Sequence, residues 1–174
     1  MLVKCDAKEL DGNVFSRIGE QWMLITAGTG AQCNTMTASW GGLGVLWGTN
    51  VAACFVRPQR YTYEFIEKSP FFTLSFLGEA YRKALALCGC KSGRDIDKVK
   101  ECGFTVKTGA GGAPFFQEAE LALVCRKLYW QDIDPTHFLD PDLDGKWYPG
   151  KDYHRMYIGE IVEVYRKNDR RERL

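Results

Sequence analysis

The stretch VAACFVRPQRYTYEFIEKSPFFTLSFL (51–77) predicts a strand, a short helix and a second strand in direct succession. Its two ends, 51–57 and 71–77, are rich in the β-branched and aromatic residues that favour strands. The segment YTYEFIEKS between them predicts a short helix that stops at Pro70, because proline pushes the preceding residue towards extended geometry. The helix is therefore a short insertion between strands.

Elsewhere in the chain, strand-like runs outnumber helical ones. Segments 21–28, 120–130 and 155–165 have strand composition, and 120–130 alternates with a period of two. Helices are expected at EAYRKALALCG (79–89), and at SGRDIDKVKECG (92–103), where a Ser and an Asp three residues later resemble a capping box. This arrangement predicts a mainly β protein with peripheral helices, a closed antiparallel barrel rather than a doubly wound parallel sheet.

Composition indicates a soluble globular protein with one domain over residues 1–174. Hydrophobic residues make up 45% of the chain and charged residues 26%. A net charge of +1 provides no electrostatic basis for binding nucleic acid or an anionic membrane. The apolar segment 40–56 is too interrupted by glycine to span a bilayer. The N-terminus lacks a signal-peptide pattern, and seven irregularly spaced cysteines fit a reducing compartment, so we expect a cytoplasmic protein.

Two arginines follow the apolar run 51–56 directly. Arg57 and Arg60 come first, and Tyr61 and Thr62 follow at the predicted helix start. Arginine is disfavoured in an apolar interior unless an anion meets it, and its planar guanidinium suits phosphate. The Thr62 hydroxyl and the free backbone N–H groups of a helix start add neutral donors. The pattern indicates an anion at the end of this strand.

A second element suited to an anion lies at Ser92, Gly93 and Arg94, where a helix is expected to begin. It combines a hydroxyl, a glycine that permits close approach and a guanidinium. Together these two elements could bind one phosphate from two sides. The alternative is that the three arginines form surface ion pairs with nearby carboxylates: Glu64, Asp95 or Asp97.

Other chemistries have weaker support in the sequence. Cys88, Cys90 and Cys102 lack the paired spacing and fourth ligand of a zinc site, so we expect small buried hydrophobes and no metal. GTGAQC (28–33) lacks the third glycine and the helix of a dinucleotide-binding turn. Neither histidine lies in a triad-like context, and no G-x-S-x-G motif is present.

Two further segments have an unusual composition. SWGGLGVLWG (39–48) carries so many glycines that either a backbone or a flat ligand approaches it closely, or it is a flexible turn between strands. Residues 132–153 carry aspartates, glycines, prolines and aromatics in a long loop. Such a loop inside a compact domain is usually a lid or an interface arm.

Five long stretches together resemble the flavin reductase-like, FMN-binding split-barrel family, and its flavoredoxin-type branch in particular. They run over nearly the whole chain: NTMTASWGGLGVLWG (34–48), VRPQRYTYEFIEKSPFFTLSF (56–76), CGCKSGRDIDKVKECGF (88–104), EAELALVCRKLYWQDIDPTHFLD (118–140) and DYHRMYIGEI (152–161). The resemblance implies a Greek-key split β-barrel that forms a homodimer, with FMN near the dimer interface.

The resemblance also implies which residues hold FMN. Residues 34–40 would lie along the isoalloxazine ring, 55–62 would lead to the ribityl chain and phosphate, and 92–98 would close on the phosphate. His154 would face the flavin and the nicotinamide as the candidate catalytic residue. The implied cofactor-binding residues are Asn34, Thr35, Met36, Thr37, Ala38, Ser39, Trp40, Phe55, Val56, Arg57, Arg60, Tyr61, Thr62, Ser92, Gly93, Arg94 and Lys98.

The implied activity is hydride transfer from NAD(P)H to flavin, followed by electron transfer to an acceptor that the sequence does not reveal. Flavin chemistry belongs to the cofactor, and the protein supplies orientation and access. Two alternatives remain: an FMN electron-transfer module reduced by a partner protein, and a non-catalytic flavin-binding protein. We expect aromatics of the 132–153 segment, Phe138, Trp147 and Tyr148, in or near the dimer interface.

Overall fold

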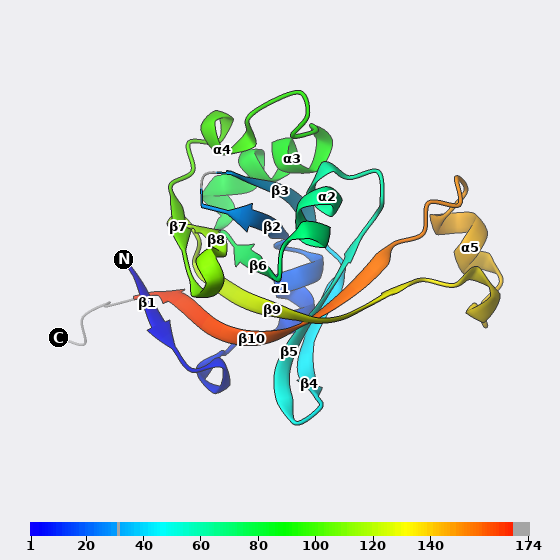
Figure 1. Cartoon of the computed structure of the whole chain (residues 1–174), viewed down its shortest axis with the longest axis horizontal. Helices are drawn as coiled ribbons and strands as arrows, with labels where there is room; N and C mark the ends of the chain where they lie inside the picture. Colours follow the sequence, from blue (N-terminus) through cyan, green and yellow to red (C-terminus); the bar gives the residue numbers. More distant parts are fainter. Residues whose placement is uncertain (31, 169–174) are drawn as a thin grey trace.

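The computed structural model describes residues 1–30 and 32–168 and is built around one antiparallel sheet (Figure 1). Its strands follow the order β3-β2-β6-β9-β10-β5-β4, with β1 paired to the other end of β10. The strands are β1 (Leu2–Cys5), β2 (Met23–Thr29), β3 (Gln32–Ala38), β4 (Gly41–Leu46), β5 (Thr49–Val56), β6 (Phe71–Phe76), β9 (Leu121–Asp132) and β10 (Arg155–Lys167). A separate small hairpin pairs β7 (Val106–Thr108) with β8 (Pro114–Phe116).

All five predicted strands are present, and the antiparallel arrangement is confirmed. The prediction of a closed barrel is wrong, because within the described residues no ladder joins the outermost strands β3 and β4. Strand β4 instead pairs along its whole length with β5 as a hairpin. The barrel is therefore open between β3 and β4.

In the described part of the chain, five α-helices accompany the sheet: α1 (Val14–Gly19), α2 (Tyr61–Lys68), α3 (Arg82–Cys90), α4 (Lys98–Glu101) and α5 (Asp142–Trp147). Helices α2, α3 and α4 pack near β2 and β3, at the top of Figure 1. The helix predicted at 61–69 is confirmed, and Ser69 before Pro70 has extended geometry as expected. The helix predicted at 79–89 is present as a 3-10 turn (Glu79–Tyr81) followed by α3.

The core follows from the alternation of side chains along β2. Met23 and Ile25 point into the barrel, where they join a buried cluster that includes Phe72 and Tyr157. Leu24 points to the opposite face and packs with a second cluster beneath α3. Because both faces of β2 are covered, this strand is buried on both sides.

The glycine-rich segment 39–48 forms β4 and the turn into β5, so the flexible-turn alternative is wrong. Trp47 and Gly48 alone connect the two strands, and both have positive φ angles of 52° and 72°. Positive φ at both central residues is the signature of a tight type I′ hairpin turn. The close backbone approach is confirmed at Gly41, where a β-carbon would lie 2.7 Å from the carbonyl oxygen of Ala53.

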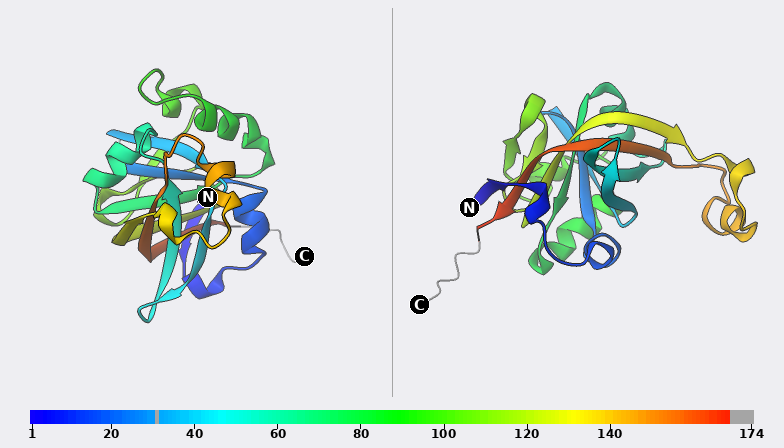
Figure 2. Two further views of the ribbon diagram at one scale, coloured as in Figure 1. Left: turned by 90° about the vertical axis from the view of Figure 1, so that its right-hand side faces the viewer. Right: turned by 90° about the horizontal axis from the view of Figure 1, so that it is seen from below.

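Residues between the ends of β9 and β10 form an arm that projects from the body (Figures 1 and 2). The arm contains a 3-10 turn (Pro135–His137) and α5, so part of the predicted long loop is helical. Its two stems are the long strands β9 and β10, which remain paired up to Asp132 and Arg155.

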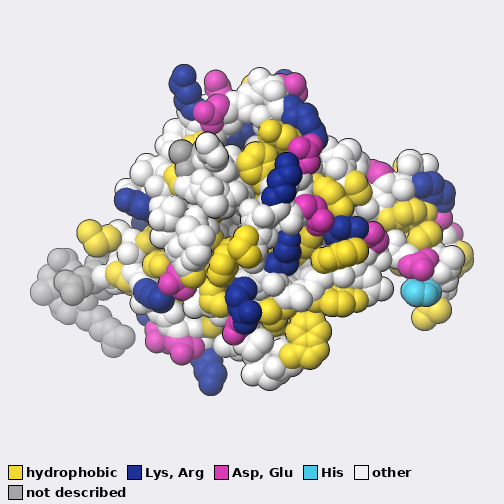
Figure 3. Space-filling model, in the orientation of Figure 1, with side chains coloured by type: hydrophobic (Ala, Val, Ile, Leu, Met, Phe, Trp, Pro, Cys, Tyr) yellow, Lys and Arg dark blue, Asp and Glu magenta, His cyan; other side chains and the backbone are white. Residues whose placement is uncertain are grey.

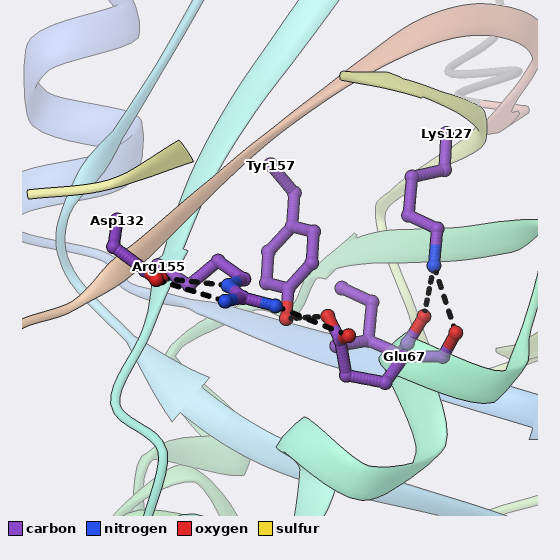
Figure 4. A network of polar contacts seen from close by, with 6 residues as sticks. Glu67, Lys127, Asp132, Arg155 and Tyr157 are labelled. Carbon is purple, nitrogen blue, oxygen red and sulfur yellow. Dashed lines mark hydrogen bonds and ion pairs between the residues drawn. The ribbon is translucent and has the colours of Figure 1, made fainter. Parts of the chain in front are cut away.

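A polar network joins the base of the arm to the end of α2 (Figure 4). Arg155 donates to Asp132 at 2.7 Å and to Glu67 at 3.2 Å, and the buried Tyr157 hydroxyl donates to Glu67 at 2.6 Å. Lys127 donates to the backbone carbonyl of Glu67 at 3.1 Å, where a cation suits the negative end of the helix dipole. The network fixes α2 relative to the stems of the arm.

Candidate functional site

A pocket of about 590 Å³ lies between β3, α2 and the segment 93–100. It brings together six of the residues singled out in the sequence, which come from three separate parts of the chain: Asn34, Thr35, Tyr61, Gly93, Arg94 and Lys98. Asp95, Ile96 and Asp97, which fall within the predicted stretch 92–98, also line it. The lining residues that were not predicted from the sequence are Cys33, Phe65, Val99, Lys100 and Val106. Of the first predicted anion-binding element only Tyr61 lines this pocket, whereas Gly93 and Arg94 of the second element both do.

Lys98 is the buried cation of this pocket, with 4% of its surface exposed. Its ammonium donates to the carbonyl oxygens of Thr35 at 2.8 Å and Cys88 at 2.9 Å. Burial lowers the pKa of Lys98, since an ammonium loses hydration in the interior. No carboxylate in the described part of the chain pairs with it.

Arg60 lies beside Lys98 and precedes the first residue of α2. Its guanidinium donates to the carbonyl oxygen of Gly89 at 2.8 Å, in the last turn of α3. Burial lowers the pKa of Arg60 as well. Cations are favoured at a helix C-terminus, so both side chains help to cap α3. They also place two positive charges next to one pocket.

Asn34 and Thr62 fix the junction of β3 and α2. The Asn34 amide donates to the Thr62 hydroxyl at 2.8 Å, and the threonine is buried. The Thr62 hydroxyl therefore has a protein partner and does not line the pocket. Gly93 packs against the same amide, because a β-carbon at Gly93 would lie 1.9 Å from Asn34 Oδ1.

The helix predicted to begin at Ser92 begins instead at Lys98, so that prediction is wrong. The Ser92 hydroxyl accepts from the Arg94 N–H at 3.1 Å in a local turn. Asp97 caps the four-residue helix α4 by accepting from the N–H of Lys100 at 3.1 Å. A short polar side chain can bond the backbone either in a turn, as Ser92 does, or at a helix N-cap, as Asp97 does here.

Arg94 forms the surface ion pair that the sequence left as an alternative. Its guanidinium contacts the carboxylate of Glu64 and lies 4.6 Å from the ring centre of Tyr61. Both charged side chains are half exposed, so the pair contributes little to stability. Arg94 is therefore a half-exposed cation that also lines the pocket.

A second cluster of predicted residues forms at the base of the arm, around Arg57. Its guanidinium donates to Asp152 at 2.5 Å and to the backbone carbonyl of Trp147 at 2.9 Å. It also lies 5.2 Å from the ring centre of Tyr148. Arg57 therefore has a carboxylate partner, and it clamps the arm to the end of β5.

His154 is buried in this second cluster. Its Nδ1 lies 2.9 Å from the hydroxyl of Tyr148, and its ring lies 4.9 Å from that of Trp40. Burial, together with the charge of Arg57, lowers the pKa of His154 to about 4, although Asp152 opposes the shift. The imidazole is therefore neutral at pH 7.

Strand β3 connects the pocket to the His154 cluster. Six residue steps separate Asn34 from Trp40, a distance of about 20 Å in extended chain. Along the way Thr37 donates to the carbonyl of Leu85 at 2.5 Å, Met36 is buried, and Ala38 and Ser39 are half-buried. The remaining predicted residues lie outside the pocket: Val56 in the core and Phe55 in a groove beside the arm.

In residues 1–30 and 32–168, no group of three His, Cys, Asp or Glu side chains is placed to hold a metal ion. No helix in this part of the chain is long and apolar enough to cross a membrane.

The sequence model of the flavin reductase like domain matches residues 15–174. The chain belongs to the flavin reductase-like family. Comparison with curated protein sequences gives no match. The flavin reductase-like fold shown here is a split barrel, and solved structures share it at low sequence identity.

Three of these structures illustrate the range of the fold. Flavoredoxin from Methanosarcina acetivorans is 23% identical, with a TM-score of 0.66 over 85% of this chain and 69% of that one. An FMN-binding domain of a flavin reductases-like enzyme from Shewanella baltica is 18% identical, with a TM-score of 0.68 over 95% of this chain and 77% of that one. The NADH:FAD oxidoreductase SgcE6 from Streptomyces globisporus, in complex with NAD and FAD fragments, is 18% identical. Its TM-score is 0.63 over 84% of this chain and 74% of that one.

Proposed function

We propose that this flavin reductase-like chain binds FMN and transfers electrons from NAD(P)H through the flavin to an acceptor. The observation that carries the proposal is the pocket above Lys98, a buried cation without a carboxylate partner in the described chain. A buried charge is costly unless it is paired, so a phosphate in this pocket would supply the missing anion.

The residues present fit FMN. Lys98, Arg94 and the backbone at Gly93 would hold the phosphate, and the nearby guanidinium of Arg60 would add positive charge. Strand β3 and the two residues after it would provide an extended segment for the remainder of the cofactor to lie along. The small side chains of Ala38 and Ser39 would suit a flat ring system beside this segment.

When bound, FMN supplies hydride acceptance and electron transfer. The chain supplies orientation, hydrogen bonds and exclusion of water. His154, neutral and in contact with Trp40, would place the nicotinamide rather than carry a positive charge to it. No acid or base is required of the protein for the hydride transfer itself.

We further propose that the protein is a cytoplasmic homodimer. Large apolar side chains are exposed on the β4–β5 hairpin and on β9, and Figure 3 shows hydrophobic side chains gathered on this flank. Trp47 is 60% exposed and lies 6.1 Å from Tyr129, and Trp130 is 50% exposed. Aromatic patches of this kind are typical of interfaces. Tyr148, expected near the interface, is buried within its own chain.

The test is the visible spectrum of the purified protein, followed by anaerobic stopped-flow mixing of the FMN-loaded protein with NADH and with NADPH. We expect a flavin spectrum that bleaches rapidly with at least one nicotinamide. A flavin that binds but does not bleach would favour the electron-transfer module reduced by a partner protein. A melting temperature indifferent to saturating FMN would contradict the cofactor assignment, since a ligand at a hundred times its Kd adds about 2.7 kcal/mol.

A further inference from the structure

The hydroxyl of Tyr148 and the Nδ1 of His154 form a buried hydrogen bond of 2.9 Å. Tyr148 is 4% exposed and lies in the arm directly after α5, and His154 lies at the base of the arm, directly before β10. The tyrosine ring is held by Phe138 on one side and by Tyr153 on another. The geometry therefore links an arm residue to the imidazole at one defined nitrogen.

The chemistry of the pair decides which atom carries the hydrogen. A neutral imidazole has one N–H donor and one acceptor nitrogen, and a phenol O–H is a donor with a pKa near 10. Within the described residues the only acceptor recorded for the hydrogen of the Tyr148 hydroxyl is the Nδ1 of His154. If His154 donated from Nδ1, the phenol hydrogen would be left without an acceptor in a buried site, which is unfavourable.

We propose that Tyr148 is a positioning residue that holds neutral His154 as the tautomer with its hydrogen on Nε2. No described group bonds Nε2, so this N–H is available to a ligand. The imidazole is then a hydrogen-bond donor, suited to a carbonyl or carboxamide oxygen, and is not a proton acceptor. The ligand part of this inference rests on the proposed function; the tautomer does not.

The arm is clamped in the position that this role requires. Arg57 bonds the carboxylate of Asp152 and the carbonyl of Trp147, on either side of Tyr148 in the sequence. Gln59 also donates to Asp152, at 2.5 Å. Trp147 packs edge-on against Trp40 at 5.1 Å, and Trp40 in turn covers the imidazole of His154. These contacts leave Tyr148 little freedom to withdraw from His154.

The tautomer can be measured directly, because the chain has two histidines and His137 is exposed. Long-range ¹H–¹⁵N spectra of the full protein at pH 7 report which ring nitrogen is protonated, and a His137→Gln variant assigns the signals. We expect an acceptor-type Nδ1 and a protonated Nε2 for His154. In Tyr148→Phe we expect a mixture of both tautomers. A protonated Nδ1 in the unmodified protein, or an unchanged tautomer in Tyr148→Phe, would overturn the proposal.

Tyr153→Phe is the matched control, because this hydroxyl bonds Asp144 at 2.8 Å and not His154. It should leave the His154 signals unchanged. In the kinetic test, Tyr148→Phe should raise the KM for the reducing nicotinamide by the inverse of the fraction of His154 that keeps its hydrogen on Nε2, about twofold for an equal mixture of tautomers, with FMN affinity unchanged. An equal rise in this KM in Tyr153→Phe would overturn the positioning role of Tyr148. If no nicotinamide reduces the unmodified protein, the proposed function fails and the spectra alone decide the tautomer.

Discussion

Gly93 and Asn34 are in such close contact that no other residue fits at position 93 without displacing the amide. A β-carbon there would lie 1.9 Å from Asn34 Oδ1 and 3.0 Å from the ring of Tyr61. The amide is itself fixed by its bond to Thr62 at 2.8 Å. The wall of the pocket and the start of α2 are therefore positioned together.

Gly93→Ala tests this contact. We expect the added methyl to displace Asn34 and narrow the pocket, so that FMN affinity falls about tenfold or more and stability falls by about 1–3 kcal/mol, as for other overpacked sites. Fluorescence titration with FMN and urea unfolding would measure the two effects. Gly44→Ala is the control, since a β-carbon at Gly44 meets nothing within 4 Å. Equal behaviour of the two variants would contradict the role of Gly93.

Lys98→Met tests whether Lys98 binds the phosphate of FMN. Removing a charge-assisted contact worth about 1.5–3 kcal/mol should lower FMN affinity about tenfold to a hundredfold. Riboflavin, which lacks the phosphate, should bind nearly as before. The free energy of unfolding without ligand should change little, because removal of a buried cation offsets the loss of its hydrogen bonds to the carbonyls of Thr35 and Cys88.

Arg57→Ala is the matched comparison for Lys98→Met. Its guanidinium is already paired with Asp152, so we expect any loss of affinity to be the same for FMN and riboflavin. Isothermal titration with both ligands distinguishes the two variants. A phosphate-selective loss in Arg57→Ala and none in Lys98→Met would assign the phosphate to the arm instead of the pocket.

The lowered pKa of His154 predicts that the folded protein loses stability in mild acid. Its folded pKa of about 4 lies below the ordinary value of 6.5, so between these pH values the unfolded chain binds a proton that the folded chain does not. Stability should fall as the pH drops from about 6.5 to about 4, by at most about 3 kcal/mol at 1.36 kcal/mol per pH unit. Urea unfolding at several pH values would measure the slope. His154→Gln should flatten it and His137→Gln should not; identical slopes in both would contradict the assignment.

The exposed aromatic patch predicts a dimer at micromolar concentration. Trp47→Ser combined with Trp130→Ser should shift sedimentation towards the monomer, because interface affinity depends on a few large aromatic side chains. The β4–β5 hairpin should remain folded, since its turn depends on Gly48 and on backbone pairing. A stable monomer of the unmodified protein would exclude the homodimer.

Local patterns in the sequence determined the strands and α2. The segment 51–77 was predicted within a residue or two at each boundary, because a proline and the alternation of side chains act over a few neighbouring residues. The helix at 92–103 was placed wrongly for the same reason: Ser92 and Asp97 are both plausible caps locally. Which of them caps the helix depends on how the segment packs against β3 and α2.

The resemblance of whole stretches of sequence indicated the family and the pocket at Asn34, Gly93 and Lys98. The sequence by itself also established the mainly β class. Only the tertiary structure decided which cations have a carboxylate partner. Arg57 pairs with Asp152, which is 95 residues away in the sequence, whereas Lys98 is buried and donates to backbone carbonyls. The tertiary structure also brought Tyr148 to His154, six residues further along the chain, through the turn between α5 and β10. The pairing of Arg57 with Asp152 across 95 residues is set by chain topology, and no local spacing encodes it.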